Sequence, residues 1–207
     1  MKRSLYPLAL AIFCGVILVA ISQAIVAKEV PTEDTSTAVF AGGCFWCVQP
    51  PFDKTPGVIK TVVGYTGGKE ENPTYKAVSA GRTGHREAIQ VTYDPSKVRY
   101  ADLVTIFWHQ INPTQANGQF ADIGHQYTTA IFYVDAEQKA IAERSKRQLE
   151  SSGKFDKPIA TKIVAAGPFW PAEDYHQSYY KKNPAHYKAY KIGSGRAAYI
   201  KRVWNED

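Results

Sequence analysis

The sequence predicts an α+β fold, a two-layer sandwich with a mixed sheet, a ferredoxin-like split β-α-β core and an irregular, Tyr-rich C-terminal tail. Short segments rich in β-branched residues alternate with segments whose apolar residues recur at helical spacing. Their order is strand, helix, two strands, helix, strand, helix, strand. The first six elements follow the order of a split β-α-β unit, which indicates this core.

The first half of the domain supplies a strand, a helix and a second strand. The apolar segment Val39-Phe40-Ala41 predicts a strand that ends in two glycines, and a helix can begin at Cys44. Pro50-Pro51 limits that helix to a turn or two, because proline lacks an amide hydrogen and clashes with the preceding turn. The β-branched segment from Val58 to Tyr65 predicts the next strand. Residues 70–84 form a loop with room for a helical turn at 75–78.

The second half supplies the remaining elements. Residues 88–93 alternate between two faces and end at Asp94-Pro95, which predicts a strand and a turn. Apolar residues at helical spacing after Asp102 predict a helix, and residues 126–134 predict a strand. Asp135 with Gln138 resembles a capping box that opens a helix to about residue 150, and residues 159–165 form the last strand. The tail after Gly167 is expected to wrap the domain without regular structure.

Residues 1–27 have the pattern of an export signal. Lys2 and Arg3 precede an uncharged run from Leu5 to Ala20, and apolar character continues to Ala27. A signal peptide has this form, and about 20 apolar residues can also span a bilayer as an N-terminal membrane anchor. We expect an exported protein, periplasmic or in the cell envelope, with cleavage favoured over anchoring. Residues 28–37 then form a polar linker, and residues 38–207 form the folded domain.

Composition excludes several classes of protein. The formal net charge of +6 is mild and no dense run of Lys and Arg occurs, so nucleic-acid binding is not expected. One domain is expected, and a monomer is the default. Only Cys44 and Cys47 lie beyond the leader, too few for a disulfide-stapled scaffold.

The Cys44–Cys47 pair therefore indicates chemistry. The thiolate is the reactive form of cysteine, and a helix start favours it. Cys47 could resolve an oxidised Cys44, as in a thioredoxin-like oxidoreductase, or the pair could be half of a zinc site. Zinc is disfavoured because no second cysteine pair exists and the five histidines do not have ligand spacing. A structural disulfide would close too small a loop to stabilise the fold much.

Three further side chains have two interpretations each. Phe45 and Trp46 are adjacent, so both cannot point into a core, and one or both could form the wall of a small apolar pocket. Glu87 falls on the same side of its strand as Ile89 and Val91. It is therefore either a buried acid, which is paired or functional, or a solvent-exposed residue at the end of the strand.

Six sequence blocks, in order, resemble the A-type peptide methionine sulfoxide reductases, and the resemblance covers residues 38 to about 190. The blocks are Gly42-Gly43-Cys44-Phe45-Trp46, Val63-Gly64-Tyr65-Thr66-Gly67-Gly68, Asn72-Pro73-Thr74-Tyr75, Thr83-Gly84-His85-Arg86-Glu87-Ala88 with Val91-Thr92-Tyr93-Asp94-Pro95, Asp122-Ile123-Gly124-His125-Gln126-Tyr127, and Ala172-Glu173-Asp174-Tyr175-His176-Gln177. Any one block is a weak signal, whereas six in order make a chance match very improbable.

The resemblance implies a reaction and its chemical groups. Cys44 would attack the sulfur of a methionine-S-sulfoxide, free or in a protein, and Glu87 would donate a proton to the oxygen. Tyr75 and Tyr127 match the two hydroxyls that bind that oxygen. The folded domain, residues 38–207, is then the catalytic domain, and its role is repair of oxidative damage.

The same resemblance implies the remaining site residues and the partners. Phe45 and Trp46 would enclose the methyl group on sulfur, and Asp122 matches a further polar position. No cofactor or metal is implied, only an external thioredoxin-like or dithiol reductant. Cys44 would become a sulfenic acid that Cys47 converts to a disulfide.

One departure from the family pattern concerns recycling. Many members carry Gly at the position of Cys47 and use cysteines near the C-terminus, but this chain has no cysteine after Cys47. Cys47 is therefore the only intramolecular candidate to resolve Cys44. Two other functions stay open from the residues alone: a general dithiol–disulfide oxidoreductase, and a non-enzymatic binding module for oxidised peptides.

Overall fold

A six-stranded mixed sheet forms the centre of the computed structural model, which describes residues 35–204. Four of its strands are β1 (Ser36–Ala41), β2 (Val58–Thr66), β3 (Arg86–Tyr93) and β6 (Ala130–Tyr133). They lie side by side in the order β6-β1-β3-β2, all antiparallel. With the intervening helices α1 (Phe45–Asp53) and α3 (Tyr100–His109), they form the predicted split β-α-β core.

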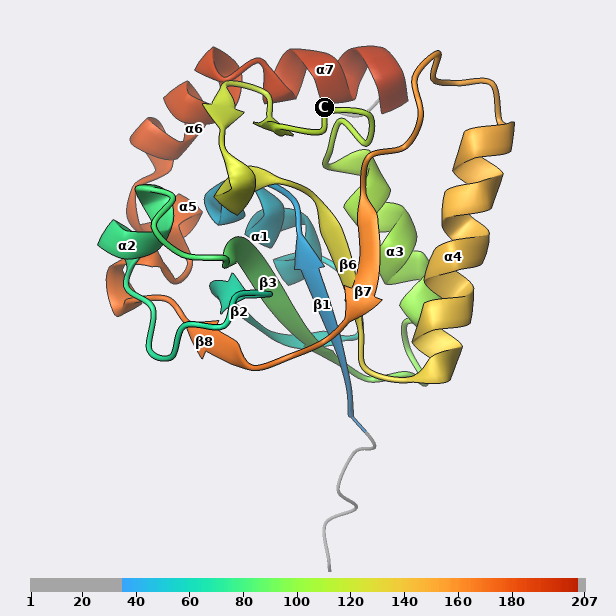
Figure 1. Cartoon of the computed structure of the whole chain (residues 1–207), viewed down its shortest axis with the longest axis horizontal. Helices are drawn as coiled ribbons and strands as arrows, with labels where there is room; N and C mark the ends of the chain where they lie inside the picture. The colour runs from blue at the N-terminus through green and yellow to red at the C-terminus, as the bar shows by residue number, and fades with distance from the viewer. Residues whose placement is uncertain (1–34, 205–207) are drawn as a thin grey trace, which may run out of the picture. The chain divides into compact units, whose positions relative to one another are not determined.

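Two further strands widen this sheet. β7 (Lys162–Ala165) pairs in parallel with β6, and β8 (Phe169–Pro171) pairs antiparallel with β2. The sheet is therefore mixed, as the sequence predicts. α4 (Ala136–Ser151) joins β6 to β7 and packs against α3 (Figure 1). A short ribbon of β4 (Gly118–Gln119) and β5 (Asp122–Ile123) lies apart from the main sheet.

The larger core lies between the sheet and the helices α1, α3 and α4. Phe40 of β1 is fully buried there, and its ring stacks on Phe52 of α1 at 5.3 Å and on Phe107 of α3 at 5.1 Å. A smaller cluster around Ala41, Ala88 and Phe132 covers the opposite side of the strands. The packing of α1 on β1 and β3 is what positions the residue that precedes α1, Cys44.

Helix α1 is longer than the sequence predicts. It begins at Phe45 and continues through Pro50 and Pro51 to Asp53. Each proline removes one helical hydrogen bond, but Val48 and Phe52 bury almost completely against the sheet and so keep this segment helical. Tertiary packing therefore outweighs the local cost of the prolines.

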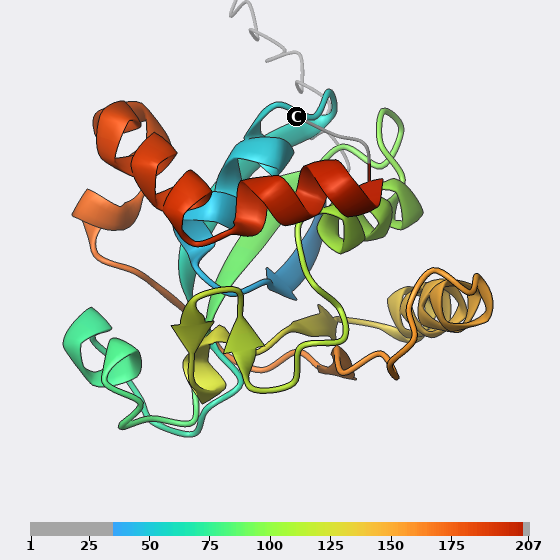
Figure 2. The same ribbon diagram turned by 90° about the horizontal axis from the view of Figure 1, so that it is seen from above.

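The prediction of an irregular C-terminal tail is wrong for residues 179–204. This segment forms α5 (Tyr179–Lys182), α6 (Pro184–Gly193) and α7 (Arg196–Trp204). Pro184 occupies the first turn of α6, where the missing amide hydrogen costs nothing, so it starts a helix. The tail wraps the domain as expected, with α7 running across one end of it (Figure 1, Figure 2).

Other boundaries differ by a few residues. The predicted strand at 126–134 begins only at Ala130, because His125–Tyr127 forms a 3-10 turn. The side-chain amide of Gln126 in that turn donates to the carbonyl of Ser79 at 2.9 Å. The helical turn considered at 75–78 is α2 (Tyr75–Ser79), capped by Thr74.

The predicted leader, residues 1–27, and the linker up to residue 34 lie outside the described residues. Within residues 35–204, no helix is both long and apolar enough to cross a bilayer. The proposals about export therefore rest on the sequence.

Replacing Phe40 by Ala should lower the free energy of unfolding by about 3–5 kcal/mol, because it removes a ring that contacts two helices. Ile59→Ala, at a side chain that is 50% exposed, is the matched control and should change stability by less than about 0.5 kcal/mol. Urea unfolding of both variants measures this, and equal losses would contradict the proposed core.

Candidate active site

The residues predicted to act together meet around one small cavity of about 90 Å³. It lies at the end of the sheet where β1 ends and β3 begins. Seven of the eight predicted site residues line it, and an eighth lining residue comes from the tail; the set is Cys44, Phe45, Trp46, Tyr75, Glu87, Asp122, Tyr127 and Tyr190. Segments far apart in the sequence thus supply one site.

The turn before α1 sets the position of Cys44. Cys44 is the N-cap residue of α1, and Gly43 before it has a φ of +79°, a conformation that favours glycine. A Cβ atom on Gly43 would approach Cβ of Gln119 to 2.5 Å and Nη2 of Arg196 to 2.9 Å. Glycine is therefore required here both for the turn and for the close packing behind the cysteine.

Glu87 is a buried carboxyl beneath the first turn of α1. It is 2% exposed and lies one residue into β3, paired with Tyr65 of β2. One carboxyl oxygen accepts the backbone N–H of Phe45 at 3.0 Å. Burial raises the pKa of Glu87 to about 8, against the lowering effect of that hydrogen bond. The carboxyl is consequently protonated at neutral pH and can donate to a bound group.

Two tyrosine hydroxyls face the same cavity. Tyr75 begins α2, and its backbone N–H donates to Glu173 at 2.9 Å. Tyr127 ends the 3-10 turn that precedes β6. Burial, and the nearby Glu87, raise the pKa of Tyr75 to about 12 and that of Tyr127 further. Both hydroxyls therefore keep their protons and can act as hydrogen-bond donors.

Aromatic rings form the wall beside Cys44. The Trp46 ring stacks on Tyr179 of α5 with centroids 3.9 Å apart, and its Nε1–H donates to Nδ1 of His176 at 3.0 Å. His176 also contacts the rings of Phe45 and Tyr75. Burial lowers the pKa of His176 to about 4, so the ring is neutral and Nδ1 is free to accept. Trp46 is therefore held as a wall and is not a residue of the main core.

Tyr190 was not predicted as a site residue. Its hydroxyl donates to the carboxylate of Asp122, and the residue lines the same cavity as Cys44. It lies on α6, in the tail that we expected to be irregular, so no periodicity placed it. His176 does lie in one of the six sequence blocks that resemble the family, and that was the available signal. Neither role could be assigned before the tail was folded onto the site.

Cys47 is the one predicted site residue that does not line the cavity. It is 1% exposed on α1, three residues after Cys44, and both cysteines are reduced. The Cys44 thiol donates a hydrogen bond to the Cys47 sulfur. Burial raises the pKa of Cys44, and this hydrogen bond lowers the pKa of Cys47, so Cys47 is the more readily ionised of the two thiols.

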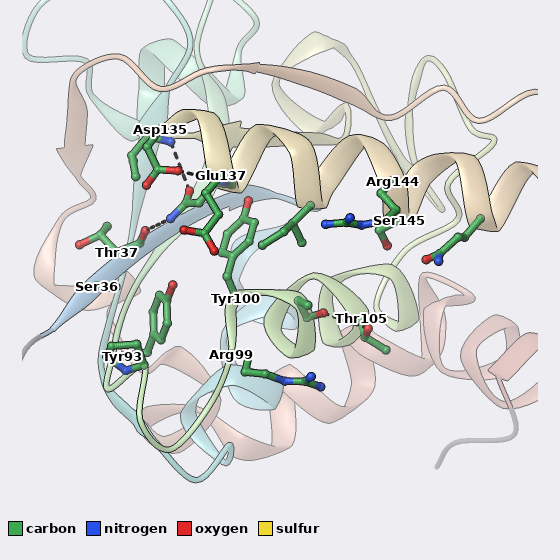
Figure 3. Close-up of a pocket in the computed structure, with 16 residues that line it drawn as sticks. Ser36, Thr37, Tyr93, Arg99, Tyr100, Thr105, Asp135, Glu137, Arg144 and Ser145 are labelled. Atoms are coloured by element: carbon green, nitrogen blue, oxygen red, sulfur yellow. Dashed lines mark hydrogen bonds between the residues drawn. The ribbon is translucent and has the colours of Figure 1, made fainter.

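A larger cavity of about 820 Å³ lies at the opposite end of the sheet, between α3 and α4. Figure 3 shows Tyr93, Tyr100, Arg99 and Arg144 among the residues that line it. It contains none of the predicted site residues and no thiol. Size alone would favour it as a binding site, but the convergent titratable groups lie at the smaller cavity, which we take as the candidate active site.

No group of three or more His, Cys, Asp or Glu side chains within residues 35–204 is arranged to hold a metal ion. The chemistry described below uses the thiols, the carboxyl and the hydroxyls of this cavity.

Comparison with known proteins identifies the family. A family model described as Peptide methionine sulfoxide reductase matches residues 36–207. This chain belongs to the peptide methionine sulfoxide reductase family. The protein named Peptide methionine sulfoxide reductase MsrA from Bacillus velezensis is 55% identical over 175 residues, covering 84% of this chain and 99% of that protein. Its namesake from Bacillus subtilis is 55% identical over 173 residues, or 84% and 98% of the two chains.

Solved structures of the family have the same fold. Methionine sulfoxide reductase A of Corynebacterium diphtheriae superposes with a TM-score of 0.65 at 37% identity, covering 72% of this chain and 76% of that one. Reduced Mxr1 from Saccharomyces cerevisiae gives a TM-score of 0.66 at 32% identity, covering 73% and 87%. As a member of the peptide methionine sulfoxide reductase family, this chain is an oxidoreductase that reduces methionine sulfoxide.

Replacing Glu87 by Gln should remove a pH dependence of stability. Between pH 4.5 and about 8 the folded wild type retains a proton that the unfolded chain releases, so its stability falls as pH rises, by about 1.4 kcal/mol per pH unit. The stability contributed by this proton is present below pH 4.5 and lost by about pH 8.

The measurement is chemical denaturation of both proteins at pH 5 and pH 7.5. The difference between wild type and Glu87→Gln isolates this carboxyl from the other titrating groups. Glu150→Gln, at an exposed residue of α4, is the control and should parallel the wild type. Parallel curves for Glu87→Gln as well would contradict a protonated, buried Glu87.

Proposed function

We propose that this enzyme reduces the S epimer of methionine sulfoxide, in proteins and as the free amino acid, through attack of Cys44 on sulfur. The observation that carries the proposal is the convergence of a thiol, a protonated carboxyl and two tyrosine hydroxyls on one cavity with an aromatic wall. Sulfoxide sulfur is a poor electrophile until its oxygen is protonated or strongly hydrogen-bonded. Glu87, Tyr75 and Tyr127 are the groups that supply those protons.

The cavity explains how the substrate would be oriented. Its volume of about 90 Å³ suits the methyl end of methionine sulfoxide rather than a whole peptide. Phe45 and Trp46 would surround the methyl group, while the sulfoxide oxygen points toward Glu87 and the tyrosines. An asymmetric site of this kind distinguishes the two epimers at sulfur, because only one places methyl and oxygen against their own partners.

The groups of the cavity and the substrate together account for every atom, proton and electron of the first step. The Cys44 sulfur bonds to the substrate oxygen after attack at sulfur and rearrangement, the substrate S–O bond breaks, and methionine leaves. Cys44 becomes a sulfenic acid, oxidised by two electrons, while the substrate is reduced by two. Glu87 gives its proton to the oxygen and regains one from the Cys44 thiol.

Cys47 closes the cycle. Side chains three residues apart at a helix start lie about 5–6 Å apart at Cβ, and a small adjustment brings them to disulfide distance. Attack of Cys47 on the Cys44 sulfenic acid forms the S–S bond and releases water. A thioredoxin-like or other dithiol donor then returns both cysteines to thiols.

The central test compares two cysteine variants in a single turnover with excess methionine-S-sulfoxide and no reductant. Cys44→Ser should release no methionine, because the attacking sulfur is gone. Cys47→Ser should release one equivalent and then stop, with the sulfenic acid trapped by a dimedone probe. As a positive control, adding dithiothreitol to this assay should allow the wild type to turn over repeatedly.

Wild-type protein should lose two hydrogens between residues 44 and 47, measured by mass spectrometry after one equivalent of substrate. Release of methionine by Cys44→Ser would overturn the assignment of the nucleophile. Continued turnover of Cys47→Ser with thioredoxin would overturn the resolving role alone.

We also propose that the enzyme is exported and acts in the periplasm or cell envelope. The basic start at Lys2 and Arg3 and the apolar run to Ala27 support this proposal. Sequencing the N-terminus of the mature protein from its native host should give a start close to residue 28. A start at residue 1 in a soluble fraction would contradict export.

A further inference from the structure

Arg196 is a buried cation that the reaction described above does not use. It is the first residue of α7 and is 1% exposed, the bulkiest of the fully buried side chains. Its guanidinium donates to the carbonyl of Gln110 at 2.6 Å and to that of Gly42 at 3.0 Å. One face lies on the Phe120 ring, 4.6 Å from its centroid. The positive charge is thus held beneath the turn that carries Cys44.

This charge has no carboxylate bonded to it. Across residues 35–204, none of the ion pairs formed by Asp and Glu includes Arg196. Two neutral carbonyls compensate only part of the cost of burying a guanidinium, so such a group requires a nearby negative charge. The groups on which its charge acts are those of the active site, because it lowers the pKa of Cys47 and of Glu87.

The sequence of the turn makes this proximity possible. A Cβ atom on Gly43 would lie 2.9 Å from Nη2 of Arg196, closer than real contacts allow. Glycine at this position therefore lets the guanidinium approach the backbone directly behind Cys44. Because the pair of cysteines lies in a water-poor environment, a cation there acts on the sulfur with little screening.

We propose that Arg196 is a positioning residue for the resolving step: its guanidinium stabilises the negative charge on Cys47 as that sulfur attacks the Cys44 sulfenic acid. This inference rests on the proposed function of the Cys44–Cys47 pair. In the step, the Cys47 thiolate forms the S–S bond, hydroxide leaves Cys44 and takes the proton released by Cys47, and water is the product. No external oxidant is needed, because the oxidising equivalent is already on Cys44.

Other groups face Cys47 and act with or against Arg196. The hydrogen bond from Cys44 and the charge of Lys191 also favour the thiolate, whereas Asp122 opposes it. Glu87 and Tyr187 face it too, and each is disfavoured as an anion by a charged Cys47. Lys191 is partly exposed, so solvent and salt screen it more than the buried Arg196. Arg196 is therefore the cation whose removal should matter.

The test separates the charge of Arg196 from its hydrogen bonds. Arg196→Gln keeps N–H donors but loses the charge, whereas Arg196→Lys keeps the charge with fewer donors. Each is placed in the full chain carrying Cys44→Ser, whose hydroxyl can still donate to Cys47. Thiolate absorbance at 240 nm is followed against pH, and the Cys44→Ser/Cys47→Ser protein is subtracted to remove the contribution of Cys14.

Arg196→Gln should lower the thiolate-to-thiol ratio of Cys47 at pH 7 about tenfold, and Arg196→Lys should change it less than about threefold. Lys191→Gln is the matched control and should change the ratio less than about twofold. With both cysteines present, Arg196→Gln should still release the first methionine but form the disulfide about tenfold more slowly at pH 7. Raising the pH should restore that rate, which a purely structural role would not.

An unchanged Cys47 titration in Arg196→Gln would overturn the proposal. If that variant does not fold by circular dichroism, Arg196→Met takes its place in the same titration, because it keeps the packing on Phe120 and removes the charge. The titration needs no substrate, so it tests Arg196 even if Cys47→Ser shows that another thiol resolves Cys44. Failure of the proposed function and failure of this inference are thereby distinguished.

Discussion

The hydrogen bond between the Phe45 backbone N–H and the Glu87 carboxyl joins the two segments on which the site depends. It connects the first turn of α1 to the start of β3, a helix and a strand whose relative position is set by the Phe40 core. The bond uses one oxygen of Glu87 and one of the unpaired amides at the helix start. Because the carboxyl is buried, the other oxygen retains its proton at neutral pH, toward the cavity. A structural contact and the proposed acid catalyst are therefore the same group.

The two cysteines of the pair lie in different electrostatic environments. Cys44 lies in a buried site beside Glu87 and favours the thiol, while Cys47 accepts its hydrogen bond and faces Arg196. Of the two sulfurs, that of Cys47 is therefore the more readily ionised. Burying these charged and polar groups costs free energy. The carbonyls of Gly42 and Gln110 offset part of it by accepting hydrogen bonds from Arg196, and Gly43 leaves room for that close packing.

The C-terminal tail completes this arrangement. Tyr190 of α6 donates to Asp122, Arg196 of α7 donates to the carbonyl of Gly42 in the turn before Cys44, and His176 accepts the ring N–H of Trp46. The tail thereby supplies a hydroxyl beside the cavity and a buried cation beneath the turn that precedes α1.

The sequence by itself determined the split β-α-β core and the thiol pair at a helix start, whereas it left Glu87 as either a buried acid or a solvent-exposed residue at the end of a strand. The core and the thiol pair can be inferred from local periodicity and from the resemblance of six blocks, because neither of these signals depends on contacts between distant residues. Only the tertiary structure decided the length of α1 and the helices of the tail, because packing against the sheet outweighs the two prolines and Pro184 begins a helix. It alone also placed Tyr190 and Arg196 at the site, since their roles depend on contacts with residues more than sixty positions away, which no local pattern encodes.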